Sequence, residues 1–101
     1  MKYNIGIILD SGKAFETYYD ATGTPPPPME EGKNTRIIPF TVDDGAGPKA
    51  ALLVHQTGFE QTATEREKGQ EVNGLSVAVC MDAPTVEEGA QVLNEWAERF
   101  L

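Results

Sequence analysis

Apolar residues recur in short runs along the chain, and the spacing within each run predicts a strand or a helix. In residues 2–10 the run Ile5 to Leu9 is rich in β-branched side chains and stops at Asp10-Ser11-Gly12, which predicts a strand followed by a turn. Because the run is apolar at successive positions, both of its faces must be buried against other elements. We expect a central strand, or one covered by a helix and a partner subunit.

The apolar residues in 14–22 fit both the two-residue period of a strand and the 3.6-residue period of a helix. Alternate positions are aromatic or threonine, as in a strand: Phe15, Thr17 and Tyr19. A helix that begins at Ser11 and ends at Gly23 would instead place four residues on one face: Ala14, Phe15, Tyr18 and Tyr19. We favour the strand, because its composition and the short Asp-Ser-Gly connection suit a hairpin.

Residues 22–33 contain Pro25 to Pro28 among glycine and glutamate, which predicts a surface loop with a polyproline II stretch. We interpret it as a stiff connector; a recognition tract for an aromatic-lined groove is the alternative. Residues 36–42 and 50–55 predict two antiparallel strands joined by a glycine-rich loop. Pro39 cannot donate a ladder hydrogen bond and therefore marks the first of them as an edge strand or a bulge.

Residues 57–72 are the most polar part of the chain and predict a solvated helix or a polar ribbon. Asn73-Gly74 is a strong hairpin signal, because a type I′ turn needs positive φ at both central residues. We therefore expect residues 70–72 to be extended and to pair with residues 75–81. The latter run is apolar throughout and predicts an interior strand.

Residues 85–101 predict an amphipathic helix. Thr85 and Glu88 match a capping box, in which a hydroxyl and a glutamate three residues later satisfy unpaired backbone amides. An apolar stripe at helical spacing follows, with Trp96 beside it: Val86, Ala90, Leu93, Ala97 and Phe100. We expect this helix to bury its stripe on a sheet.

Together these elements predict one α+β domain over residues 1–101, with a mainly antiparallel sheet of four to five strands and the C-terminal helix on one face. With 101 residues, 40% of them hydrophobic, the chain is long enough for a single core. Several strands are apolar on both faces, while only one helix is clearly predicted. The second cover is expected from the segment around Phe59 or from a partner.

The charge balance restricts the class of partner. Sixteen acidic residues against eight Lys and Arg give a net charge of -8, spread along the chain. Such a field opposes direct binding to nucleic acid and favours a basic protein. The lone cysteine, Cys80, excludes an internal disulfide, and the chain shows neither a signal peptide nor a membrane-spanning run. We therefore expect a cytoplasmic protein without membrane contact.

Two glycine-containing motifs require comparison with nucleotide-binding sites. Residues 45–50 match the loose form G-x-G-x-x-A, but the following segment is predicted to be extended, whereas a dinucleotide site needs a helix there. Residues 10–13 lack the full spacing of a phosphate-binding loop. We interpret both as turns and predict no cofactor.

His55 and Cys80 are the only histidine and the only cysteine, and no spacing brings them together as a catalytic pair. Cys80 lies in an apolar run and is expected to be buried as a small hydrophobic residue. Adjacent acids such as Asp43 and Asp44 do not form the spaced set of oxygens that a metal ion needs. We predict no catalytic and no metal-binding residues.

This profile favours a small, non-enzymatic protein-binding or accessory protein, by analogy with regulators and phage-type inhibitors that act on a basic partner. The side chains offered for the interaction are aromatic or acidic: Tyr18, Tyr19, Glu87, Glu88, Glu95 and Glu98. The alternatives are a homo-oligomeric small enzyme or ligand carrier, and a structural subunit of a phage tail-like assembly.

Overall fold

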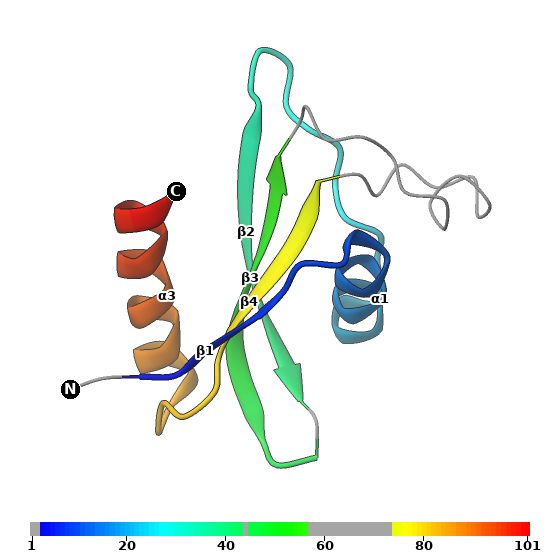
Figure 1. Cartoon of the computed structure of the whole chain (residues 1–101). Helices are drawn as coiled ribbons and strands as arrows, with labels where there is room; N and C mark the ends of the chain where they lie inside the picture. The colour runs from blue at the N-terminus through cyan, green and yellow to red at the C-terminus, as the bar shows by residue number, and fades with distance from the viewer. Residues whose placement is uncertain (1–2, 44, 57–73) are drawn as a thin grey trace.

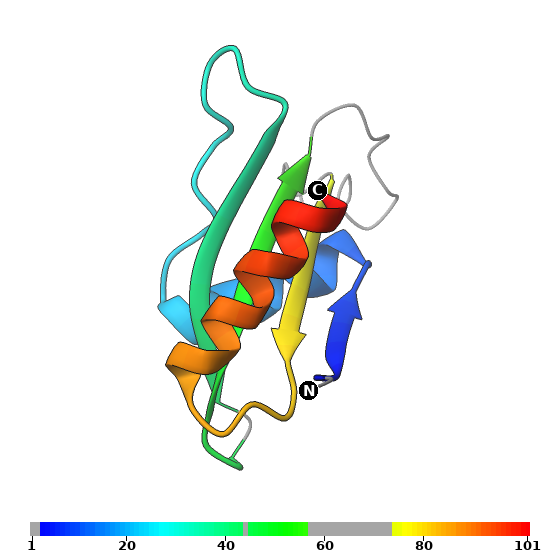
Figure 2. The same ribbon diagram turned by 90° about the vertical axis from the view of Figure 1, so that its left-hand side faces the viewer.

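The computed structural model describes residues 3–43, 45–56 and 74–101. The elements follow in the order β1 (Ile5–Ile8), α1 (Ser11–Thr22), β2 (Thr35–Asp43), β3 (Pro48–Gln56), β4 (Leu75–Cys80) and α3 (Val86–Phe100). The four strands form one antiparallel sheet in the order β1-β4-β3-β2, with α1 and α3 on opposite faces (Figures 1 and 2). The predicted α+β fold, with the C-terminal helix packed on an antiparallel sheet, is confirmed.

The segment that we favoured as a strand at residues 14–22 is helix α1, so that prediction and its hairpin are wrong. Asp10 caps the helix by accepting a hydrogen bond from the Lys13 N–H at 2.9 Å. Gly23 ends it in the left-handed conformation, with φ of 74°, and donates its N–H to the Tyr19 carbonyl. The two caps fix the helical alternative, in which Ala14 and Tyr18 share the buried face.

The sheet has a hydrophobic core on each face. Under α1 the buried residues are Ala14, Tyr18, Ala51, Leu53, Leu75, Val77 and Val79. Under α3 they are Ala50, Leu52, Ala78, Cys80, Leu93 and Ala97. Helix α1 therefore supplies the second cover that we had expected from the Phe59 segment or from a partner. Residues 57–72, predicted as a polar helix or ribbon, lie outside the described residues, as does the extended stretch at 70–72.

The strand order confirms some sequence predictions and corrects one. β2 and β3 form the predicted hairpin, with Pro39 in an edge strand, and β4 lies in the interior between β1 and β3. β1, which we expected to be either central or covered by a helix and a partner subunit, pairs with β4 alone among the described strands and is the other edge of the sheet. Residues 45–47 connect β2 to β3 as a turn, whereas residues 48–50 are already the start of β3, so a strand and not a helix follows the glycines.

Helix α3 begins as predicted, with the Thr85 hydroxyl accepting from the Glu88 N–H at 3.1 Å. Leu93 and Ala97 of the apolar stripe are buried. Phe100 of the same stripe is 66% exposed, contrary to expectation. Neither described helix has the length and apolar character needed to cross a bilayer.

The Ser11 hydroxyl forms hydrogen bonds with the part of β4 that extends beyond the end of β1. Leu75 is buried, and its backbone faces the side on which β1 has already ended. Ser11, in the first turn of α1, donates its hydroxyl to the Leu75 carbonyl and accepts the Leu75 N–H, both at 3.2 Å. One side chain thus satisfies two backbone groups and ties α1 to the sheet.

Candidate protein-interaction surface

The hydrogen-bond pattern of β1 leaves part of its backbone directed away from the sheet. The Met81 N–H donates to the Asn4 carbonyl at 2.9 Å, and in the same register Gly6 faces Val79. In an antiparallel pair, bonded and non-bonded positions alternate, so the backbones of Gly6 and Ile8 point toward β4. The N–H and C=O groups of Ile5 and Ile7 therefore point outward, along the edge.

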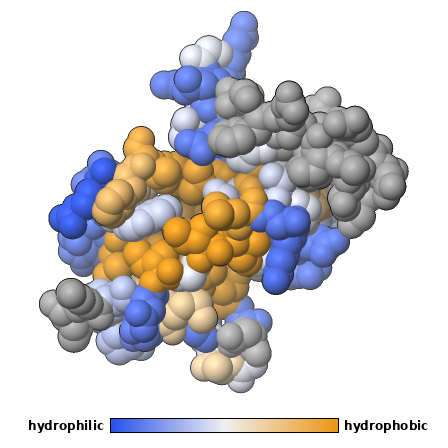
Figure 3. All heavy atoms as spheres, viewed as in Figure 1, coloured by the Kyte–Doolittle hydropathy of each residue, from blue (hydrophilic) through white to orange (hydrophobic). Residues whose placement is uncertain are grey.

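Exposed apolar side chains gather at this edge. Seven large hydrophobic residues among those described are exposed, and three of them lie in β1, directly after β1 or directly after β4. We call these three the β1-edge surface: Ile7 (50% exposed), Leu9 (79%) and Met81 (46%). Figure 3, which looks onto β1, shows apolar atoms spread over this edge between the two helices.

The opposite edge of the sheet is protected. Pro39 removes an amide donor from the middle of β2, and the neighbouring Arg36 donates to the Pro28 carbonyl at 2.6 Å, which ties the proline-rich loop to the strand. Proline and charged side chains are the usual means of preventing an edge strand from pairing with other chains. β1 contains neither, since its four residues are Ile, Gly, Ile and Ile. The two edges of one sheet thus differ in their accessibility to another strand.

A carboxylate stands near each end of β1. Asp10 follows Leu9 and caps α1. Asp82 lies beside the start of the strand, where it accepts hydrogen bonds from the Asn4 backbone N–H at 2.9 Å and from the Asn4 side-chain amide at 3.2 Å. Both carboxylates hold structural hydrogen bonds. The apolar edge is therefore flanked by acid at its two ends.

Tyr18 and Tyr19, the two tyrosines predicted to take part in an interaction, lie in different environments. Tyr18 is 7% exposed and packs edge-on against Phe40, with ring centroids 5.0 Å apart, so it belongs to the core. Tyr19 is 47% exposed and stacks on Phe15. Tyr19 belongs to α1, and neither tyrosine is part of the β1-edge surface.

The predicted acidic residues lie on α3. Glu87, Glu95 and Glu98 are exposed, on the side of the helix away from the sheet. Glu88 is half-buried, with one carboxylate oxygen that is buried and has no hydrogen-bond partner. Partial burial, together with this neighbouring carboxylate, raises the pKa of the Tyr3 hydroxyl. The sequence thus located acidic surface but missed the β1-edge surface, because strand order is not visible in a periodic pattern.

His55 and Cys80 do not form a pair. His55 lies opposite Arg36 and Leu75, toward α1, whereas Cys80 is buried under α3 on the other face of the sheet. Burial of the imidazole, and then the Arg36 charge, lower the pKa of His55, whose Nδ1 is buried without a hydrogen-bond partner. The described residues hold no cluster of three or more His, Cys, Asp or Glu side chains suited to a metal ion.

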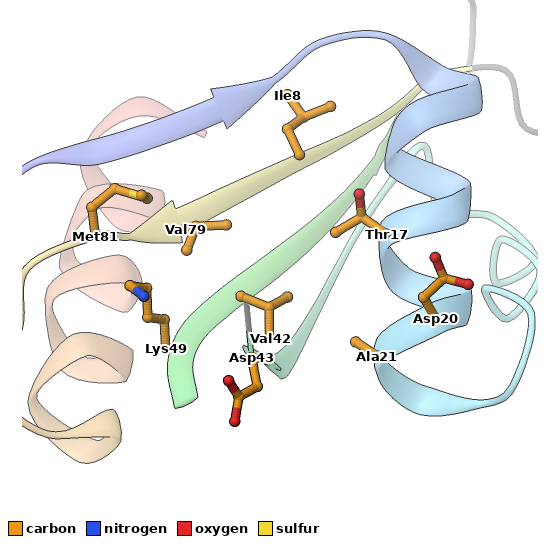
Figure 4. Close-up of a pocket in the computed structure, with 9 residues that line it drawn as sticks. All are labelled: Ile8, Thr17, Asp20, Ala21, Val42, Asp43, Lys49, Val79 and Met81. Carbon is orange, nitrogen blue, oxygen red and sulfur yellow. The ribbon is translucent and has the colours of Figure 1, made fainter. Parts of the chain in front are cut away.

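A cavity of about 380 Å³ opens between α1 and the sheet (Figure 4). Its walls are mainly apolar: Ile8, Ala21, Val42, Val79 and Met81. Four polar side chains also line it: Thr17 and Asp20 from α1, Asp43 from the end of β2, and Lys49 from β3. Both its size and its mixed lining are in the range of small-molecule sites.

Compared with known proteins, the chain matches no protein-family model, no curated protein and no solved structure.

Proposed function

We propose that this chain is a protein-binding accessory domain that recognises a basic protein through the β1-edge surface. The observation that supports this most strongly is the gathering of three exposed apolar residues at one edge of a sheet whose two faces are both covered by helices. Exposed apolar surface rimmed by polar residues is typical of protein interaction sites.

Charge supports the choice of a basic partner. The chain carries a net charge of -8, and Asp10 and Asp82 flank the apolar edge. Opposite charge at the rim of an interface accelerates encounter and excludes partners of like charge, while the apolar centre supplies affinity. The β1-edge surface has this arrangement.

A pull-down from a lysate of the source organism tests the proposal with three baits: the wild-type chain, Ile7→Lys and Ile37→Lys. Ile7 and Ile37 are exposed isoleucines in the two opposite edge strands, and the register places both on the α3 face of the sheet. Each exposed substitution should change the free energy of unfolding by less than about 0.5 kcal/mol. Circular dichroism checks that both variants are folded.

The expected result is a stoichiometric basic protein that binds the wild type and Ile37→Lys and is lost with Ile7→Lys. If all three baits retain the same partners, the β1-edge surface is not the binding site. If no stoichiometric partner is retained by any bait, the function itself is refuted.

A small-molecule carrier is the second candidate, and the cavity beside α1 supports it. Ala21 is exposed on the helix and lines the cavity, so Ala21→Phe should fill it without disturbing the buried core. An NMR fragment screen is expected to shift amide signals of the cavity-lining residues in the wild type and not in Ala21→Phe. A screen in which no fragment shifts these signals refutes the carrier function.

A further inference from the structure

The outward backbone groups of β1 are spaced to accept another strand. The N–H and C=O groups of Ile5 and Ile7 point away from β4, and Gly6 and Ile8 between and after them are already paired with Val79 and Val77. An extended segment laid along β1 would bond to these groups and extend the sheet. Strand addition of this kind supplies affinity through the backbone and specificity through alternate side chains.

Side chains near the edge offer apolar contact on both faces of such a strand. On the α3 face lie Ile7, which is half exposed, and Ile5, which packs against the core under α3. On the α1 face lie Ile8 and Met81, which packs against Gly6. Because successive side chains of a strand point to opposite faces, both faces of the added strand would meet apolar neighbours.

The acidic residues at the two ends of β1, Asp10 and Asp82, disfavour a second copy of the chain as the added strand. Two β1 strands paired antiparallel about a two-fold axis would place Asp10 of one copy near the Asn4–Asp82 end of the other. Like charges would then meet at both ends of the interface, between two molecules that each carry -8. A segment with a basic residue at each end would meet opposite charge instead.

We propose that the partner adds an extended segment to β1 as a fifth strand, and that this segment has apolar residues at its centre and Lys or Arg at both ends. The inference rests on the proposed function, since it names the chemistry of the partner at the same surface.

A random peptide library displayed on phage, selected against the full chain, provides the test. The enriched peptides are expected to share a centre rich in β-branched and aromatic residues, free of proline and flanked by Lys or Arg. The inference is refuted if the enriched peptides are acidic, proline-rich or periodic as in a helix, or if none is enriched. It is refuted equally if Ile7→Lys binds the enriched peptide as tightly as the wild type.

The charge component is measured with that peptide and two double variants of equal net charge. Asp10→Asn with Asp82→Asn should weaken binding by about threefold to tenfold at low salt, because each exposed pair contributes modestly. The control, Glu30→Gln with Glu31→Gln, removes the same charge from the loop tied to β2 at the opposite edge and should change the dissociation constant by less than about twofold. Equal weakening by both double variants would show that only the net charge matters and would overturn the proposed end contacts.

The failures of the two proposals are distinguishable. If the peptide binds equally well after N-methylation of its central amides, strand addition is wrong while binding at the β1-edge surface stands. If sedimentation shows a dimer of the free chain that Ile7→Lys abolishes, the occupant is a second copy and the basic segment is refuted. If Ile7→Lys leaves the native partner bound in the pull-down, the proposed function itself is refuted, whatever the peptide experiments show.

Discussion

Gly89 sets the distance between α3 and the sheet. It is buried in the second turn of the helix, and a Cβ at this position would lie 3.1 Å from the Ala50 Cβ and 3.4 Å from the Cβ atoms of Ala83 and Cys80. Optimal carbon contacts are about 3.5–4.0 Å, so Gly89→Ala would push α3 away from β3. Alanine gains about 1 kcal/mol of helix propensity over glycine, whereas overpacking a core costs about 1–3 kcal/mol. We expect Gly89→Ala to lower the free energy of unfolding by about 1 kcal/mol.

A double-mutant cycle separates the two effects. Ala50→Gly removes the methyl group that the new Cβ would meet, so in that background Gly89→Ala should raise the free energy of unfolding by about 1 kcal/mol, the helix-propensity gain alone. Urea denaturation followed by the fluorescence of Trp96, the one tryptophan, measures both backgrounds. As a control, Asn94→Ala on the exposed side of α3 should stabilise by about 0.5 kcal/mol in either background. If Gly89→Ala stabilises the wild type fully and shows no coupling to Ala50→Gly, the close contact between α3 and β3 does not exist.

Two further predictions concern the Ser11 bridge and the lone histidine. Ser11→Ala leaves the N–H and C=O of the buried Leu75 without the hydroxyl and should cost about 1–3 kcal/mol in urea denaturation, whereas Thr17→Ala, which removes an exposed hydroxyl, should cost less than about 0.5 kcal/mol. Equal costs would contradict the bridging role. Because burial and Arg36 lower the pKa of His55 below its usual 6.5, the unfolded chain binds the proton more tightly, so stability should fall as the pH drops from about 6.5 toward that lowered pKa. NMR titration of the single imidazole checks this, and a pKa at or above 6.5 would refute it.

Much of the fold was predictable because most elements have one strong local signal. Asp43 and Pro48 flank the loop of the β2–β3 hairpin, Pro39 marks an edge strand, and Thr85 caps a helix with clear periodicity. Each signal depends on neighbours along the chain, and the tertiary structure agrees with it. These elements were correctly predicted for that reason.

Helix α1 was mispredicted because two periods coexist in its sequence. Phe15 and Tyr19 fit an alternating strand, but both also lie on a helix, where they stack with ring centroids 6.2 Å apart. The prediction weighed a helix from Ser11 to Gly23 but gave more weight to the aromatic and threonine content; in the structure Asp10 and Gly23 cap this helix. Local hydrogen bonds at the two ends decided the structure.

The candidate site could not be predicted, because it depends on which strands become neighbours. Ile5 to Ile8 is apolar enough for a central strand, yet β4 and β3 fill the interior and leave β1 at the edge. Exposure of Ile7 follows from that order and not from its own sequence context. Asp10 and Asp82 can be recognised as flanking an edge strand only once the strand order is known.

Amide hydrogen exchange at β1 tests the central claim, that a partner strand adds to this edge. In the free chain the Gly6 and Ile8 amides, which bond to β4, should exchange slowly, and the outward Ile5 and Ile7 amides should exchange fast. Saturation with the enriched basic peptide should slow exchange at Ile5 and Ile7 by about tenfold or more and leave Gly6 and Ile8 nearly unchanged. Unaltered exchange at Ile5 and Ile7 in the saturated complex would contradict strand addition at β1.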